Sequence, residues 1–393
     1  MHVHDCLAVC PPGLEELVAD EWRELRLRPG KPIHGGVPFR ATDRELYLAN
    51  VWTRLATRVI VRLGTFVAKS FAELEARAAS LPWDLYLTDG ITPVFRVTAA
   101  KSKLYHTDAI AERLHRVTGT TPVIEDDEHT LDPDRVQLFV VRFSHDKVTI
   151  SVDSSGESLH RRGWRQQVAK APLRETLAAA MVRASGWTGH TPLVDPLCGS
   201  GTIAIEGALA ACGYAPGANR TFAFQRWASF QPGTWASVNA GVIKAATDRV
   251  RRRDVPPIIA ADRDAGAARA TLANAERAGV ADLIQVRNAA LSLTISSLTT
   301  LDFPGLLLTN PPYGERIGER GPRSGAGVGG QRDLRDLYAA LGTAVREQLP
   351  GWSLGLLVSD MVLAGQVRLP LVEKFATSNG GIDVSMVTYD PGS

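Results

Sequence analysis

The chain has 393 residues, which is too long for one ordinary domain and predicts two or three. Its 45% hydrophobic and 22% charged residues exclude disordered and fibrous classes, and no apolar run reaches the ~20 residues of a membrane span. Four cysteines and a start without a signal-peptide pattern predict a cytoplasmic protein with no disulfide scaffold, metal or membrane. The net charge is +2, and we expect a monomer.

The first 155 residues alternate short strands and helices, as small α+β domains do. Residues 1–55 contain a strand around Leu7 and a helix whose apolar residues recur at helical spacing from Leu14 to Leu25. Further strands are predicted at 57–63, 94–98, 136–143 and 147–152, with helices at 71–81 and 107–117. We therefore expect two N-terminal domains, 1–55 and 56–155, and a linker over 156–170.

From residue 171 onward, buried strands alternate with helices. The predicted strands are 192–195, 257–262, 281–288, 305–309, 352–359 and 382–389. This alternation is typical of a parallel α/β sheet, which binds ligands at the carboxyl ends of its strands. Two stretches depart from it: an aromatic insertion over 213–254, which ends in Arg251-Arg252-Arg253, and a Gly-rich loop over 318–330. The fold class is α/β, with a Rossmann-like domain over 171–393.

A glycine loop follows the first of these strands. Such a strand–loop–helix turn brings backbone N–H groups and the positive end of a helix to one point, which suits an anionic or zwitterionic group. A nucleotide pyrophosphate would fit as well as an amino-acid carboxylate, and a glycine turn without a ligand is the plain alternative. The Walker pattern is absent. The candidate ligand-binding residues are Asp195, Cys198, Gly199, Ser200, Gly201 and Thr202.

Asp262 ends the next predicted strand, where an acidic side chain is placed to accept hydrogen bonds from ribose hydroxyls. The usual spacing from the glycines is ~20 residues, and the insertion lengthens it here. The alternative is a helix N-cap, a role that Asp262 or Asp264 could serve. We favour the ribose.

The third motif is an apolar strand that stops at Asn310-Pro311-Pro312-Tyr313. Prolines lack an N–H and fix φ, so the corner keeps its carbonyls out of helix and sheet. The Asn310 oxygen and the Pro311 carbonyl then form a rigid acceptor pair for a planar NH₂ group whose ring stacks on Tyr313. Fixing those hydrogens favours the attacking form of a poorly nucleophilic amine.

Together the three motifs predict S-adenosylmethionine as the cofactor. Its amino-acid end would lie at the glycine loop, its ribose at Asp262, and its methyl group near Asn310. A dehydrogenase would use the first two motifs but not the third. Adenine N6 and glutamine amides are rival targets, since the same corner serves those planar groups too.

At this point the chain resembles the THUMP-domain RNA guanine-N2 methyltransferases of the bacterial large-subunit ribosomal RNA type, which are related to tRNA enzymes. The start resembles the family's ferredoxin-like domain, and residues ~60–155 resemble its THUMP domain. The linker and the first catalytic helix are similar as well. The segments that carry the resemblance are 10–17, 151–165, 171–178, 195–202 and 310–314.

The resemblance implies a class I methyltransferase that uses S-adenosylmethionine and recognises structured RNA. Asn310, Pro311, Pro312 and Tyr313 would hold the target guanine. One position departs from the family: many relatives carry an Asp that accepts from the adenine amine, and this chain has Asn288 there. An amide oxygen still accepts a hydrogen bond, so the departure bears on affinity.

Local clusters of arginine are the candidates for RNA contact, because the fork of guanidinium donors suits phosphate oxygens. A solvated linker is the alternative for the second cluster. The two clusters are Arg54, Arg58 and Arg62, and Arg161, Arg162 and Arg165.

The sequence therefore predicts an enzyme that forms N2-methylguanosine in 23S ribosomal RNA. A tRNA guanine-N2 methyltransferase of the same architecture is the alternative, and a non-catalytic ribosome-assembly factor is a third reading. Base flipping is expected, because the target amine inside a duplex cannot reach a pocket at the sheet edge.

Overall fold

The computed structural model describes residues 3–121, 135–166, 173–251, 255–301, 303–313 and 329–392. The chain packs as two units. The N-terminal unit consists of Met1–Cys10, Val18–His160 and Pro216–Ile243, and the C-terminal unit of Pro11–Leu17, Arg161–Ala215 and Lys244–Ser393. Each unit is described by itself below.

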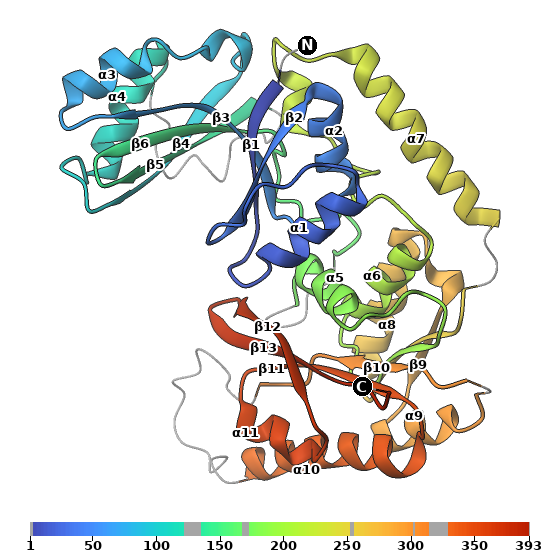
Figure 1. Cartoon of the computed structure of the whole chain (residues 1–393). Helices are drawn as coiled ribbons and strands as arrows, with labels where there is room; N and C mark the ends of the chain where they lie inside the picture. Colours follow the sequence, from blue (N-terminus) through green and yellow to red (C-terminus); the bar gives the residue numbers. More distant parts are fainter. Residues whose placement is uncertain are drawn as a thin grey trace. The chain divides into compact units, whose positions relative to one another are not determined.

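The N-terminal unit is built on one six-stranded sheet with the order β2-β1-β3-β6-β5-β4 (Figure 1). Only β4 and β5 pair in parallel. Strand β3 pairs with β1 on one side and β6 on the other, so the sheet runs through both predicted N-terminal domains. The strands are β1 Val3–Val9, β2 Gly36–Thr42, β3 Arg58–Val67, β4 Thr92–Ala100, β5 Val136–Ser144 and β6 Lys147–Asp153.

Helices cover one face of this sheet. Alternate strand residues such as Cys6, Val61 and Phe139 are buried there, as the period of two in a strand requires. The helices are α1 Glu15–Glu24, α2 Asp43–Trp52, α3 Phe71–Ala78 and α4 Thr107–Thr118, with a 3₁₀ turn at Trp83–Leu85. Strand β2 and helix α2 were not predicted. A capping box between Thr42 and Glu45 starts α2, whose apolar face is weakly patterned.

The aromatic insertion completes the core of the N-terminal unit. It forms a 3₁₀ turn, Ala223–Arg226, and helix α7, Pro232–Arg251. The ring of Phe224 stacks on Tyr47 of α2 with centroids 4.3 Å apart, and Phe222 lies 5.2 Å from Phe224. Trp227 Nε1 donates to Gln137 Oε1 on β5 at 2.8 Å. The insertion interrupts the α/β alternation of the C-terminal unit because most of its residues, Pro216–Ile243, pack in the N-terminal unit. The triplet Arg251–Arg253 lies largely outside the described residues.

The C-terminal unit carries a seven-stranded sheet with the order β12-β13-β11-β10-β7-β8-β9. The α/β fold class is confirmed, but the prediction of a wholly parallel sheet is wrong at one edge. Strand β13 runs antiparallel to β11, and the unpredicted β12 runs antiparallel to β13 through a hairpin at Gly380 and Gly381, both with positive φ. The strands are β7 Leu193–Asp195, β8 Ile258–Asp262, β9 Ile284–Asn288, β10 Leu306–Thr309, β11 Ser353–Val358, β12 Val372–Asn379 and β13 Ile382–Tyr389.

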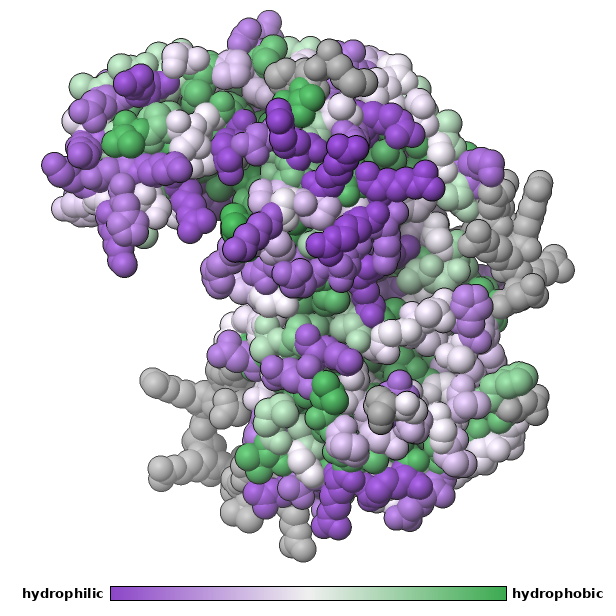
Figure 2. Space-filling view, in the orientation of Figure 1, coloured by the Kyte–Doolittle hydropathy of each residue, from purple (hydrophilic) through white to green (hydrophobic). Residues whose placement is uncertain are grey.

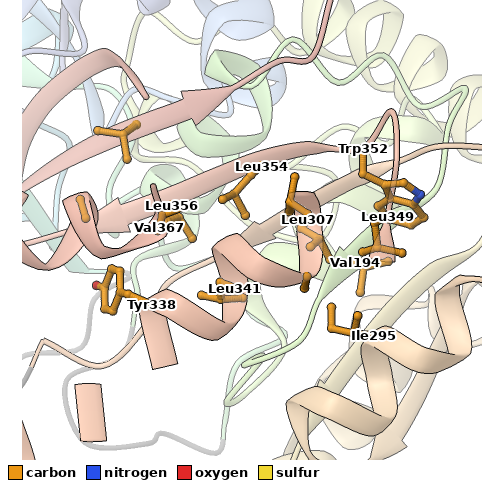
Figure 3. Packing of buried hydrophobic residues seen from close by; sticks show 14 of the residues in the cluster. Val194, Ile295, Leu307, Tyr338, Leu341, Leu349, Trp352, Leu354, Leu356 and Val367 are labelled. Atoms are coloured by element: carbon orange, nitrogen blue, oxygen red, sulfur yellow. The ribbon is translucent and has the colours of Figure 1, made fainter. Parts of the chain in front are cut away.

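Helices lie on both sides of this sheet (Figure 1). On one side are α5 Glu175–Ala184, α6 Thr202–Ala211 and α8 Ala265–Ala278, and on the other α9 Leu291–Leu298, α10 Gly329–Thr343 and α11 Met361–Ala364. Figure 3 shows strand residues Val194, Leu307 and Leu354 packed with Ile295 of α9 and Leu341 of α10. This core fixes the strand ends that carry the site. The Gly-rich loop lies mostly outside the described residues, and no described helix is long and apolar enough to span a membrane.

Candidate active site

Three of the predicted site positions lie at the carboxyl ends of strands β10, β8 and β9 of the C-terminal sheet. The register pairs Leu307 with Val194 and Asp195 with Ala260, so Asn310 and Asp262 stand at one level on either side of the loop after β7. Asn288 pairs directly with Asp262. The row from Asn310 to Asn288 therefore spans three strand spacings, about 14 Å.

The Asp195 carboxyl lies inside the protein at the end of β7 and is only 2% exposed. Its Oδ1 accepts from Thr309 Oγ1 at 2.7 Å and from the Leu197 N–H at 3.2 Å. Burial raises the pKa of this carboxyl to about 7, and the nearby charge of Asp262 adds to the rise. Such a group ionises readily once a cation lies beside it.

The glycine loop is tied to the strand next to it. Cys198 donates its N–H to the Ala261 carbonyl, and Gly199 donates its N–H to Asp262 Oδ2, both at 3.0 Å. Gly201 precedes α6 with φ +82°, and a Cβ there would lie 2.5 Å from Thr271 Cγ2. A side chain at Gly201 is therefore excluded twice, by backbone conformation and by contact.

Two buried polar residues of α8 hold this loop from behind. Thr271 Oγ1 donates to the Gly199 carbonyl and Asn274 Nδ2 to the Ser200 carbonyl, both at 3.0 Å. Neither residue was predicted as part of the site. Their signal in the sequence is a pair of polar residues three apart, which share one face of a helix.

Two predicted ligand-binding side chains face away from the row. Cys198 Sγ lies 3.5 Å from Thr271 Oγ1, and burial raises the pKa of its thiol, so the thiol stays protonated. Thr202 Oγ1 accepts from Arg165 Nη2 at 2.8 Å. Neither side chain is therefore available to a ligand in the loop, and the Cys198 N–H and carbonyl are already bonded to Ala261 and Gly201.

Asp262 and Asn288 are oriented by hydrogen bonds around the start of α8. Asp264 serves as the helix N-cap, accepting from the Gly266 N–H, so Asp262 is not needed for that role. Asn288 Nδ2 donates to the carbonyls of Asp262 and Arg263, each at 3.0 Å. Two carbonyl acceptors identify that atom as the nitrogen, which leaves the amide oxygen of Asn288 pointing the other way as an acceptor.

The double-proline corner follows β10, as predicted, but its asparagine already accepts one hydrogen bond. Tyr313 Oη donates to Asn310 Oδ1 at 2.6 Å. Asn379, a buried residue at the end of β12, donates from Nδ2 to Tyr313 Oη at 3.5 Å. Burial raises the pKa of the Tyr313 phenol, so the group stays a donor. An amide oxygen has two lone pairs, and one is left for a ligand.

Asn379 was missed because its strand was not predicted, and no local pattern marks it. A polar residue that closes a polar edge strand resembles any solvated residue in the sequence. Asn379 contacts Tyr313 only in the folded sheet, where β12 pairs with β13 and the end of β12 lies close to the corner after β10. Gly314, the last residue of the motif, lies outside the described residues.

The six predicted RNA-binding arginines are divided between the two units, three in each. Arg162 is buried and pairs with Glu206 at 3.4 Å, and Arg165 pairs with Glu175 at 3.3 Å. Both guanidinium groups are therefore paired inside the C-terminal unit with little exposed surface, and their contact with RNA stays a prediction. Arg161 is exposed in the same unit.

The other three predicted arginines belong to the N-terminal unit. Arg58 forms an ion pair with the buried carboxylate of Asp153, and Arg54 is half-buried beside Glu21. Arg62 is 37% exposed and pairs with Asp5 at 2.7 Å. In the part of the chain that the structure describes, no group of three His, Cys, Asp or Glu side chains could hold a metal ion.

Comparisons with known proteins identify two family domains in the chain. Residues 162–388 match the model of the RMKL-like methyltransferase domain, and residues 5–60 match the RlmL ferredoxin-like domain. The chain is 32% identical to the ribosomal RNA large subunit methyltransferase K/L of Saccharophagus degradans over 98% of its own length and 51% of that protein. It thus spans about half the length of the curated relatives it matches.

Two solved structures have the same fold over nearly the whole chain. A possible methylase from Clostridium difficile 630 matches with a TM-score of 0.82 and 28% identity, covering 99% of this chain and 98% of that one. A second protein, complexed with SAH, matches with a TM-score of 0.81 and 25% identity over the same shares.

Proposed function

Because this chain belongs to the family of RMKL-like methyltransferase domains, we propose that it uses S-adenosylmethionine to methylate the exocyclic N2 of guanosine in large-subunit ribosomal RNA. The row from Asn310 across the glycine loop to Asp262 and Asn288 carries the proposal. Under this proposal, residues 171–393 form the catalytic domain. The segments 1–55 and 56–155 are the ferredoxin-like and THUMP domains of a cytoplasmic RNA-binding enzyme.

The residues of the row fit S-adenosylmethionine. The free acceptor oxygen of Asn288 suits the adenine amine, and the Asp262 carboxylate suits ribose hydroxyls. The buried Asp195 carboxyl suits a cation at the amino-acid end, and the N–H groups at the start of α6 suit a carboxylate. When bound, the cofactor supplies an electrophilic methyl group.

The corner after β10 acts on the target amine. Asn310 Oδ1 and the Pro311 carbonyl would accept the two N–H groups of guanine N2, and the ring of Tyr313 would stack on the base. The hydrogen bonds from Asn379 to Tyr313 and from Tyr313 to Asn310 hold this acceptor in place before the base arrives. The amine loses its proton after it attacks, so no base has to ionise first.

Ribosomal RNA is preferred to tRNA as the substrate because the relatives matched over 98% of this chain are named ribosomal RNA large subunit methyltransferase K/L. The RlmL ferredoxin-like match at the N-terminus also belongs to that architecture. A tRNA substrate and a non-catalytic role are the alternatives that the experiment below separates.

The test is methyl transfer by the full chain to ribosomal RNA and, separately, to tRNA, taken from a strain that lacks the gene. Nucleosides are then resolved by mass spectrometry. We expect N2-methylguanosine in the large-subunit RNA and none in the tRNA. N6-methyladenosine, or no modification at all, would overturn the proposal.

Asn310→Ala tests the amine clamp. Loss of one preorganised group in a water-excluded site lowers kcat by about 10²–10³-fold in comparable cases. We expect that loss with unchanged affinity for SAH in calorimetry. Transfer at the parental rate would show that Asn310 does not hold the amine.

A further inference from the structure

The N-terminal sheet has a second face that its helices do not cover. Cross-strand register places the residues that alternate with the helix-facing ones on this face. Where β3 pairs with the end of β6, Ile60, Ser151 and Asp153 on this face are buried, and the other side chains of the face are partly or fully exposed. One row across four strands reads Thr65, Thr149, Arg142 and Thr98. Figure 2 shows hydrophilic side chains over the region that Figure 1 labels β4, β5 and β6. We call this surface the open face.

Basic residues dominate the charges on the open face. Its acidic residues on the strands are Asp5, which pairs with Arg62, and Asp153, which is buried against Arg58. The other charged residues on the strands of this face are all basic and exposed, and no ion pair joins them to the residues that the structure describes: Arg40 on β2, Arg96 on β4, Arg142 on β5 and Lys147 on β6.

These cations are spread across the sheet. Arg96 pairs in register with Val140, so Arg142 lies one strand away and two residues further along. Arg62 lies three strands from Arg96 in the sheet order, about 14 Å at the usual strand spacing. Donors distributed in this way match a run of phosphate groups better than one small anion.

The uncharged residues of the open face indicate how RNA would be read. Exposed threonine hydroxyls lie among the cations, and Thr65 and Thr149 place their Oγ1 atoms 3.3 Å apart. The aliphatic side chains of Val94, Leu138 and Val140 also lie among the cations, each partly exposed. The strand positions on this face hold no Phe, Tyr or Trp. Sheets that bind unstacked bases use aromatic side chains as platforms. This face offers donors for phosphate and 2′-hydroxyl oxygens instead.

We propose that the open face binds the sugar-phosphate backbone of structured RNA without reading its bases, through Arg96 and Arg142 at its β4 edge, Lys147 on β6 and Arg62 on β3. This inference rests on the proposed function for the presence of RNA, and it locates the contact on residues that sequence analysis had not selected, apart from Arg62. The RNA-facing residues are thus distributed over β3, β4, β5 and β6, not gathered in one stretch of sequence.

The test compares two double variants of the full chain. R96Q/R142Q removes two charges from the open face, and R77Q/R116Q removes two exposed charges from α3 and α4, which cover the opposite face. Binding to a labelled transcript of large-subunit ribosomal RNA is measured by anisotropy over a range of salt. We expect R96Q/R142Q to weaken binding at least tenfold and to lower the slope of log K against log salt by about one per lost phosphate contact.

The control R77Q/R116Q should stay within twofold of the parent, and SAH affinity should be unchanged in both variants. A helical RNA of unrelated sequence should show the same loss, because the contact is to the backbone. If R96Q/R142Q binds as the parent does, or if the control loses as much, the open face is not the binding surface. Failure of the proposed function is a separate outcome, since the parent would then transfer no methyl group to RNA.

Discussion

At the scale of single residues, the buried Asp195 carboxyl makes cofactor binding depend on pH. Its pKa of about 7 reflects burial, and a bound ammonium cation favours the ionised form and lowers that pKa. Affinity for SAH should therefore rise with pH up to about 7 and then level off, with a loss of up to tenfold per pH unit below that point. Calorimetry between about pH 5.5 and 7.5 measures this.

The control for that experiment is Asp195→Asn, which cannot ionise. We expect it to bind SAH more weakly and with no dependence on pH in this range. A slope that persists in the variant would assign the titration to another group. Asp262 is the acidic neighbour that acts on Asp195, so the Asp262→Asn variant should lower the pH at which affinity levels off.

Asn379 is expected to act through Tyr313. Asn379→Leu removes the donor to Tyr313 Oη, which loosens the phenol that is bonded to Asn310. We expect kcat to fall about five- to tenfold with unchanged SAH affinity, whereas a purely structural defect would lower both. In a Tyr313→Phe background the same change should have almost no further effect, because the linked group is gone. Additive losses in the double variant would contradict the linkage.

How much of the site the sequence predicts depends on whether a residue belongs to a local motif. Asp195, Asp262 and Asn310 each end an apolar strand, and the order of parallel strands brings such ends together. The hydrogen bonds of Thr271, Asn274 and Asn379 join residues far apart in the chain. The spacing of Thr271 and Asn274 indicates a shared helix face, but no local pattern indicates the partners of these three residues. Their roles stay predictions, as do those of the motif residues.

At the scale of elements, the aromatic insertion is expected to stabilise a unit that lies far from it in the sequence. Phe224 is fully buried and stacked on Tyr47. Phe224→Ala should destabilise the N-terminal unit by about 3–5 kcal/mol, the usual cost of such a core truncation. Hydrogen exchange should then quicken in α2 and β5. Phe303→Ala is the matched control, because Phe303 is 69% exposed, and it should leave exchange unchanged.

Element prediction failed where a strand carries no apolar pattern. The edge strand β12 reads Val-Glu-Lys-Phe-Ala-Thr-Ser-Asn and is mostly exposed, so neither continuous hydrophobicity nor strict alternation marks it. The paired glycines of its hairpin were the available signal. By contrast, β8 and β10 are buried on both faces and read as apolar runs, which is why their ends could be located.

At the scale of the whole molecule, the sequence indicates two α+β segments followed by an α/β domain. It does not indicate which residue ranges pack into which unit. The chain leaves the N-terminal unit at His160, returns to it from Pro216 to Ile243, and leaves again. This return of the chain to the N-terminal unit depends on contacts between residues distant in sequence, such as Gln137 with Trp227. The spacing of hydrophobic residues within a short stretch of sequence does not indicate such contacts.

That return path has a consequence for the order in which the protein can mature. When a ribosome has delivered the first 160 residues, Tyr47 still lacks the rings of Phe222 and Phe224, and Gln137 lacks its indole partner. The leading part of the nascent polypeptide must wait, with its apolar surface uncovered, until about 80 more residues have emerged. Chaperone binding to ribosome-bound nascent chains should peak in that interval and decline once residue 243 has left the exit tunnel.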